Sequence, residues 1–198
     1  MIGFEEKECG ENSQKEGKPD IFSKKFLETR QILLSGEIDK DMADRIIQQL
    51  LVLEAESSEP VKLYINSPGG DVDAGFAIFD VIRFIRAPVI TIGTGLVASA
   101  AAIVLLATPK ERRCGLPNSR YLIHQPLSGI KGVATEIEIH ARELEKIRVD
   151  INRIIAEETG QPPEKVSADT DRDFWMTSAE ALDYGLISKV LHSRDDLD

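Results

Sequence analysis

The chain has 198 residues, of which 42% are hydrophobic and 29% charged, and its formal net charge is −10 at pH 7. This length suits one well-packed domain and is short for two. The acidic balance argues against nucleic acid and anionic membrane surfaces as partners, because both require a basic face on the protein. The longest apolar stretch, 97–107, is too short to cross a bilayer.

Residues 1–19 are mostly polar or charged, which predicts a mobile tail or loop. From residue 21 onward, short apolar runs alternate with stretches in which apolar residues recur every three or four positions. The runs predict strands at 31–34, 61–65, 89–93, 121–124 and 186–191. The periodic stretches predict helices at 39–56, with Asp39 as N-cap, and at 73–84, 99–107, 134–158 and 178–184. This alternation indicates an α/β fold with mainly parallel pairing and right-handed crossovers.

The two ends of the chain and its cysteines suggest where the protein works. The N-terminus lacks the basic start and apolar block of a secretory signal, and it is too acidic for a mitochondrial transit peptide. The two cysteines, Cys9 and Cys114, lie far apart in unlike settings, which favours free thiols in a reducing compartment. We therefore expect a cytoplasmic protein, ending in a polar tail at 192–198.

Three polar residues have the chemistry of a serine nucleophile and its helpers. Ser99 lies among small residues, His124 ends an apolar strand, and Asp173 closes an acidic cluster. A serine hydroxyl becomes nucleophilic when a histidine accepts its proton and a carboxylate orients that histidine. The reference pKa of histidine, about 6.5, suits it to act as a base near neutral pH. The other two histidines, His140 and His192, lie in more polar contexts and are weaker candidates.

Backbone amides near Ser99 are candidates for an oxyanion hole. The glycine pair Gly69–Gly70 follows a predicted strand, and glycine lets the backbone approach a ligand closely. The predicted helix that starts at Ser99 exposes free N–H groups, so the Ala100 amide is one expected donor and a glycine amide the second. Each feature taken alone also fits a structural role, such as a packed serine, a structural histidine, a turn or a solvated loop. The chain lacks a G-x-S-x-G elbow, a P-loop and a metal-ligand cluster of recognisable spacing.

Several segments together resemble the proteolytic subunits of the Clp protease family, ClpP. They follow the family's order between about residues 20 and 191, at 63–70, 95–102, 116–120, 123–126, 136–139, 169–176 and 184–187. The resemblance implies one peptidase domain at 20–191, folded as a ClpP/crotonase-like head of repeated βαβ units. It also implies a projecting strand–helix handle at about 129–158.

The resemblance further implies a serine endopeptidase whose chemical step needs no cofactor and no metal. It assigns catalysis to Ser99, His124 and Asp173, and the oxyanion donors to the amides of Gly70 and Ala100. Members of this family form two stacked heptameric rings, a tetradecamer, around a chamber. An AAA+ ATPase of the ClpX, ClpA or ClpC type feeds unfolded polypeptides into that chamber.

Two contact surfaces are also implied. Arg172, with Asp171 beside it, matches the arginine that pairs across the ring–ring interface. We expect this contact to couple ring assembly to alignment of the catalytic residues. The groove in which the ATPase docks corresponds to Tyr64, Phe84, Ile92 and Leu116.

The chain departs from the family pattern in four places. The N-terminal tail lacks the apolar pattern of axial gating loops, and Ala100 replaces a common methionine, although only its backbone is needed. Lys62, Thr94 and Cys114 stand at groove positions that are more often apolar. Lys131 and Val133 replace polar handle residues that bond across the rings. These departures favour a divergent paralogue that pairs with a second ClpP-type subunit in a mixed assembly.

Other functions compete with that of a self-sufficient peptidase. The first is a regulatory or structural ring subunit that is active only beside a second ClpP-type subunit. A remote alternative is a crotonase-like CoA-thioester enzyme, which shares the turning βαβ architecture and the oxyanion hole. A pure binding module explains none of the three catalytic positions.

Overall fold

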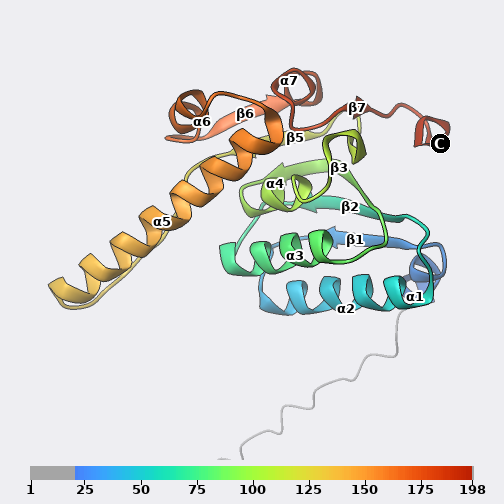
Figure 1. Cartoon of the computed structure of the whole chain (residues 1–198), viewed down its shortest axis with the longest axis horizontal. Helices are drawn as coiled ribbons and strands as arrows, with labels where there is room; N and C mark the ends of the chain where they lie inside the picture. Colours follow the sequence, from blue (N-terminus) through green and yellow to red (C-terminus); the bar gives the residue numbers. More distant parts are fainter. Residues whose placement is uncertain (1–20, 198) are drawn as a thin grey trace, which may run out of the picture.

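The computed structural model describes residues 21–197, so the tail predicted at 1–19 lies outside the described residues. Within them, seven strands form one sheet. Five run parallel, in the order β1 (Gln31–Ser35), β2 (Val61–Ser67), β3 (Val89–Ala98), β4 (Arg113–Gly115) and β7 (Lys189–Val190). The prediction of an α/β fold with mainly parallel pairing is confirmed (Figure 1).

The remaining two strands attach to the second half of β3. β5 (Arg120–Ile123) pairs parallel with that half, and β6 (Phe174–Thr177) pairs antiparallel with β5. The first half of β3 pairs with β4 instead. Between the two halves Gly95 has a φ of +58°, and a Cβ there would lie 2.7 Å from the Asn66 side chain. Glycine is therefore required where β3 changes neighbours.

Helices cover the sheet and extend from it. They are α1 (Ile21–Glu28), α2 (Lys40–Glu56), α3 (Val72–Phe84), α4 (Ala100–Leu105), α5 (Ala134–Thr159), α6 (Pro163–Asp169) and α7 (Ser178–Tyr184). Two 3-10 turns, η1 (Lys110–Arg112) and η2 (Arg194–Leu197), complete the described elements. Asp39 caps α2 as predicted, because its carboxylate accepts the Met42 N–H at 2.7 Å. Figure 1 shows α2 and α3 side by side beneath β1 and β2. Their buried apolar residues form part of the main hydrophobic core.

The structure corrects several predicted boundaries. β3 continues to Ala98, five residues beyond the predicted end at 93, and α4 spans only Ala100–Leu105 rather than 99–107. An unbroken run of small and apolar residues has no periodicity that could separate strand from helix. The sequence pattern does not predict α1, β4, α6 or β6, which are all short.

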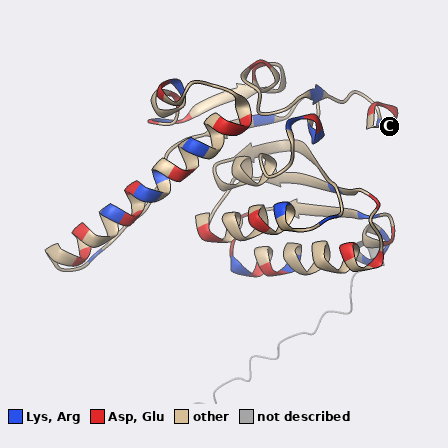
Figure 2. Cartoon of the chain, viewed as in Figure 1, with Lys and Arg blue, Asp and Glu red and all other residues tan. Residues whose placement is uncertain are grey.

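The long helix α5 projects from the sheet (Figure 1). Its buried residues all lie in its last third, from Ile151 to Thr159, while Ile137, Ile139 and Val149 are exposed. Figure 2 shows acidic and basic residues interspersed along it, and several form exposed i,i+3 or i,i+4 ion pairs. Such pairs each add only about 0.3–0.5 kcal/mol. Residues 125–133, before α5, form no strand, so the strand expected in the handle is not found in this chain.

A buried ion pair fastens the end of α5 to the sheet. The Arg113 side chain on β4 is fully buried, and its Nε donates to the Thr108 carbonyl at 2.6 Å. Its other nitrogens donate to the carbonyl and the carboxylate of Glu158 near the end of α5, and Arg83 also binds that carboxylate. Burial lowers the pKa of Arg113, and the Glu158 charge opposes that shift. The guanidinium therefore depends on Glu158 for compensation of its charge.

We predict that Glu158→Ala lowers the free energy of unfolding by about 3–5 kcal/mol, because it leaves a buried guanidinium without a counter-charge. Arg83→Ala is the matched control: it removes the second, 44% exposed partner of the same carboxylate and should cost about 1 kcal/mol or less. Urea denaturation followed by Trp175 fluorescence measures both. An equal loss in the two variants would contradict the role given to Glu158.

Candidate active site

Ser99 occupies the single-residue turn between β3 and α4. Its backbone φ and ψ are +56° and −124°, a region that residues with a side chain rarely adopt. Neighbouring groups hold this conformation: the Ser99 N–H donates to the Leu122 carbonyl at 2.9 Å, and the Ser99 carbonyl accepts the Ala102 N–H at 2.9 Å. Strained backbone of this kind persists where the surrounding structure fixes it, and it is common at active sites.

The pairing of β5 with β6 brings His124 and Asp173 together. Ile123 pairs with Phe174 at the end of this antiparallel ladder. His124, which follows β5, therefore lies next to Asp173, which precedes β6. His124 Nδ1 is 3.0 Å from Asp173 Oδ1, and His124 Nε2 is 2.8 Å from Ser99 Oγ. The three predicted side chains therefore form one continuous hydrogen-bonded chain. His124 is 13% exposed and Asp173 61% exposed, so the carboxylate is the open end of that chain.

The loop that carries Asp173 is anchored on two sides. The Gln125 N–H donates to the Thr170 carbonyl at 2.6 Å, and its side-chain amide donates to the Asp171 carbonyl at 2.7 Å. The buried Thr170 hydroxyl donates to the Asn152 side chain on α5 at 2.8 Å. The position of Asp173 thus depends on both β5 and α5. No local sequence pattern assigns this role to Gln125, Thr170 or Asn152, which lie in three separate segments.

The two amides expected to bind an oxyanion are both available. Within residues 21–197, the N–H groups of Gly70 and Ala100 donate no hydrogen bond to the protein. The glycine loop is held by Ile38, which donates to the Gly69 carbonyl at 2.8 Å and accepts the Asp71 N–H at 2.7 Å. A Cβ on Gly69, whose φ is +91°, would lie 2.7 Å from the Ser99 Cβ. Only glycine lets this loop pack directly against Ser99.

An apolar pocket adjoins the Ser99 hydroxyl. Ser99 and His124 are among its lining residues. Its apolar walls are formed by Val72, Phe76, Ile103, Ile123, Pro126, Ile151 and Ile155. These residues come from several separate segments, so the sequence alone did not reveal the pocket. Two of them, Ile151 and Ile155, lie four residues apart on the long helix, in the periodic pattern that predicted it.

The other predicted contact residues lie in two further places. Tyr64, Ile92 and Leu116 line one groove, as expected. Phe84 is not among its lining residues, because it stands 81% exposed at the end of α3. Arg172 and Asp171 lie on the surface beside Asp173, where the Arg172 guanidinium donates to the Asp171 carbonyl at 3.2 Å.

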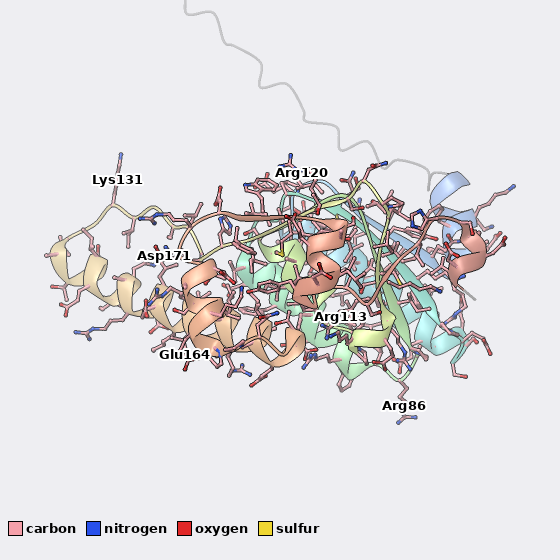
Figure 3. The ribbon with its side chains drawn as sticks, turned by 90° about the horizontal axis from the view of Figure 1, so that it is seen from above. Arg86, Arg113, Arg120, Lys131, Glu164 and Asp171 are labelled. Carbon is pink, nitrogen blue, oxygen red and sulfur yellow. The ribbon has the colours of Figure 1, made fainter. Side chains whose placement is uncertain are left out.

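The handle residue Lys131 points away from the body of the molecule (Figure 3). His140, one of the weaker histidine candidates, lies within hydrogen-bond distance, 2.7 Å, of the Ser128 hydroxyl. Across residues 21–197 there is no group of three or more His, Cys, Asp and Glu side chains placed to hold a metal ion. None of the helices in that range is long and apolar enough to span a membrane.

Known proteins share both the sequence and the fold. A family model described as Clp protease matches residues 13–194. ATP-dependent Clp protease proteolytic subunit 2 of Treponema denticola is 63% identical over 188 residues, 94% of each chain. The subunit of the same name from Treponema pallidum is 64% identical over 178 residues, 89% of each chain. The solved structure of a ClpP1 mutant from Listeria monocytogenes has a TM-score of 0.84 and 47% identity, covering 90% of this chain and 100% of that chain.

These matches confirm the predicted ClpP-type fold. They leave the crotonase-like alternative without support, because the matched model spans nearly the whole chain and the relatives are proteolytic subunits. The chain, with its serine, histidine and aspartate joined by hydrogen bonds, belongs to the Clp protease family of serine peptidases.

Proposed function

We propose that this chain cleaves unfolded polypeptides, with Ser99 as nucleophile, His124 as general base and Asp173 as the carboxylate that orients the imidazole. The observation that carries this proposal is the chain of two hydrogen bonds, 2.8 Å from Ser99 Oγ to His124 Nε2 and 3.0 Å from His124 Nδ1 to Asp173 Oδ1. This is the arrangement that activates a serine hydroxyl.

The geometry supports an acyl-enzyme mechanism. Ser99 Oγ attacks the peptide carbonyl carbon while His124 Nε2 takes the hydroxyl proton. The N–H groups of Gly70 and Ala100 bind the oxygen on which negative charge develops, and losing one such donor typically costs about 2.7–4 kcal/mol. His124 then gives its proton to the departing amine. Water, deprotonated by His124, hydrolyses the ester and restores the Ser99 hydroxyl.

The pocket beside Ser99 gives this mechanism a preference. Its walls include Val72, Phe76 and Ile103, so it suits an apolar side chain on the residue whose carbonyl is attacked. Burying one apolar side chain there contributes about 1.5–3 kcal/mol. A charged side chain in that position would lose its hydration without gaining a partner.

The assembly is part of the proposal: two stacked heptameric rings whose chamber is fed by an AAA+ ATPase. Apolar side chains that stay exposed in the single chain support it, since soluble proteins rarely leave such patches uncovered. They lie on the segment before α5 and on α5 itself, at Leu127, Val133, Ile137, Ile139 and Val149. We assign ATPase docking to the groove lined by Tyr64, Ile92 and Leu116.

The same proposal places the protein in the cytoplasm, on the ground of its cysteines. Cys114 is a buried free thiol, and burial raises its pKa, which keeps it in the unreactive protonated form. Such a thiol is typical of a reducing compartment.

We predict that a fluorophosphonate serine probe labels Ser99, with the site located by mass spectrometry of the digested protein. Ser99→Ala should lose both the label and peptide hydrolysis, the latter by at least about 10³-fold, because the nucleophile is gone. Folding should persist, since one hydroxyl contributes little to packing there. Ser58, an exposed serine two residues beyond α2, offers the matched control: Ser58→Ala should keep full activity. Undiminished hydrolysis by Ser99→Ala would refute the nucleophile.

A second candidate function is favoured by one set of observations. Lys131 and Val133 replace polar residues expected to bond across the rings, and Asp173 is the open end of the hydrogen-bonded chain. Both features fit a subunit whose site is completed by a second ClpP-type subunit. The same probe distinguishes the two functions. Label on Ser99 in the lone protein indicates a self-sufficient peptidase, whereas label only after the second subunit is added indicates a mixed assembly.

Ring contact and site alignment should be coupled through Arg172, which lies one residue before Asp173. We predict that Arg172→Ala shifts tetradecamers toward single heptamers and lowers peptidase activity at least about tenfold, because a charge pair across an interface is lost beside the site. Mass photometry and peptide hydrolysis measure the two effects. Arg86→Ala removes the same charge from a side chain that points outward, far from Asp171 in Figure 3, and should change neither. An Arg172→Ala protein that is fully assembled and fully active would contradict the coupling between ring contact and site alignment.

A further inference from the structure

A small hydrophobic cluster, separate from the main core, forms the floor of the groove assigned to docking. Ile92, Cys114 and Leu191 are buried in it, and Tyr64 packs against them. The groove above them has a volume of about 320 Å³. Leu197, from the last turn of the chain, also packs against this cluster and lines the groove.

The segment that carries Leu197 is folded, although the sequence predicted only a polar tail at 192–198. After β7 the chain turns back through η2 (Arg194–Leu197). The Asp196 carboxylate accepts the N–H groups of His192 at 2.7 Å and Ser193 at 2.8 Å, and the Lys189 amine binds the Asp196 carbonyl. These backbone donors hold the pKa of Asp196 below its usual range, because they stabilise its charged carboxylate. The turn therefore holds Leu197 at the groove.

Leu197 is the one apolar residue in the sequence 192–198. Its neighbours in that segment are polar and mostly exposed, and they are held by a few hydrogen bonds at the surface. Segments with so few buried contacts open at low cost. The segment can therefore leave the groove at low cost. Only one apolar side chain would become exposed, and the rest of the turn is already polar and largely solvated.

We propose that Leu197 is a built-in competitor for the docking groove, occupying a place that an apolar side chain of the partner ATPase must take. This proposal rests on the assignment of that groove to docking. A partner binds only the fraction of molecules in which the segment has moved away, and its apparent Kd rises in inverse proportion to that fraction. Since Leu197 is only partly buried, the expected penalty is about three- to tenfold.

The test measures binding of an apolar peptide to the full chain. The probe is fluorescein-labelled Ser-Gly-Leu-Leu-Gly-Ser, followed by fluorescence anisotropy, with Ser99 first blocked by fluorophosphonate so that the peptide is not cleaved. Leu197→Ser should lower the Kd about three- to tenfold. Asp196→Ala, which loosens the turn without touching the groove lining, should lower it in the same direction. Asp195→Ser is the matched control in the same turn: this exposed side chain does not line the groove, so the Kd should not change.

A further variant locates the binding and separates the two proposals. Adding Tyr64→Ala to Leu197→Ser should weaken binding at least about tenfold, because Tyr64 forms part of the groove. Tyr64-dependent binding that is equally tight with and without Leu197 would overturn the competitor and leave the docking groove standing. Binding that ignores Tyr64, or no binding to any variant, would refute the docking assignment and the competitor with it. The far-UV circular dichroism spectrum of Leu197→Ser should match that of the unaltered chain, which verifies its fold.

Discussion

The position of β5 between β3 and β6 is the constraint on which the site depends. Ser99 follows the last residue of β3, His124 follows the last residue of β5, and Asp173 precedes the first residue of β6. Because Ala98 is in register with Leu122 and Ile123 with Phe174, the ends of these three strands lie side by side. The single antiparallel pairing among the described strands is what turns Asp173 toward His124; a parallel β6 would carry it to the opposite end.

Close packing allows Ser99 to keep its unusual backbone. The helix that follows, α4, is made of small and apolar residues and is buried along its whole length, so it fixes the chain on one side of Ser99. The Gly69 loop fills the other side, where any side chain would collide with Ser99. The same packing leaves the Gly70 and Ala100 amides without a hydrogen-bond acceptor among residues 21–197. Strain, glycine and small side chains therefore serve one purpose, which is to place a hydroxyl beside two free N–H groups.

How far the sequence predicted this structure depended on the kind of contact involved. Amphipathic helices such as α2 and α3 were predicted well, because each has one buried stripe and, in α2, the capping residue Asp39. The strand β6 was missed, because four residues carry too little pattern and the strand exists through its pairing with β5. Ser99 and His124 stood out by local context, whereas Asp173 is one of three aspartates in its acidic cluster, which by itself also fits a solvated loop. The apolar pocket, the buried Arg113 and the folded C-terminal turn depend on contacts between distant segments, which no local pattern records.

The hydrogen bond between Thr170 and Asn152 mechanically couples the projecting helix to the loop that carries Asp173. With Glu158 fastened to Arg113 as fulcrum, α5 is a lever whose tip at Ala134 lies about 36 Å away and whose Asn152 lies about 9 Å away, at 1.5 Å of rise per residue. A sideways displacement of the tip therefore reaches Asn152 reduced about fourfold, so ~4 Å at the tip moves the Thr170 anchor by ~1 Å. A displacement of several ångströms at the tip of α5 thus becomes about 1 Å near Asp173. A change of about 1 Å is enough to make or break a hydrogen bond between carboxylate and imidazole.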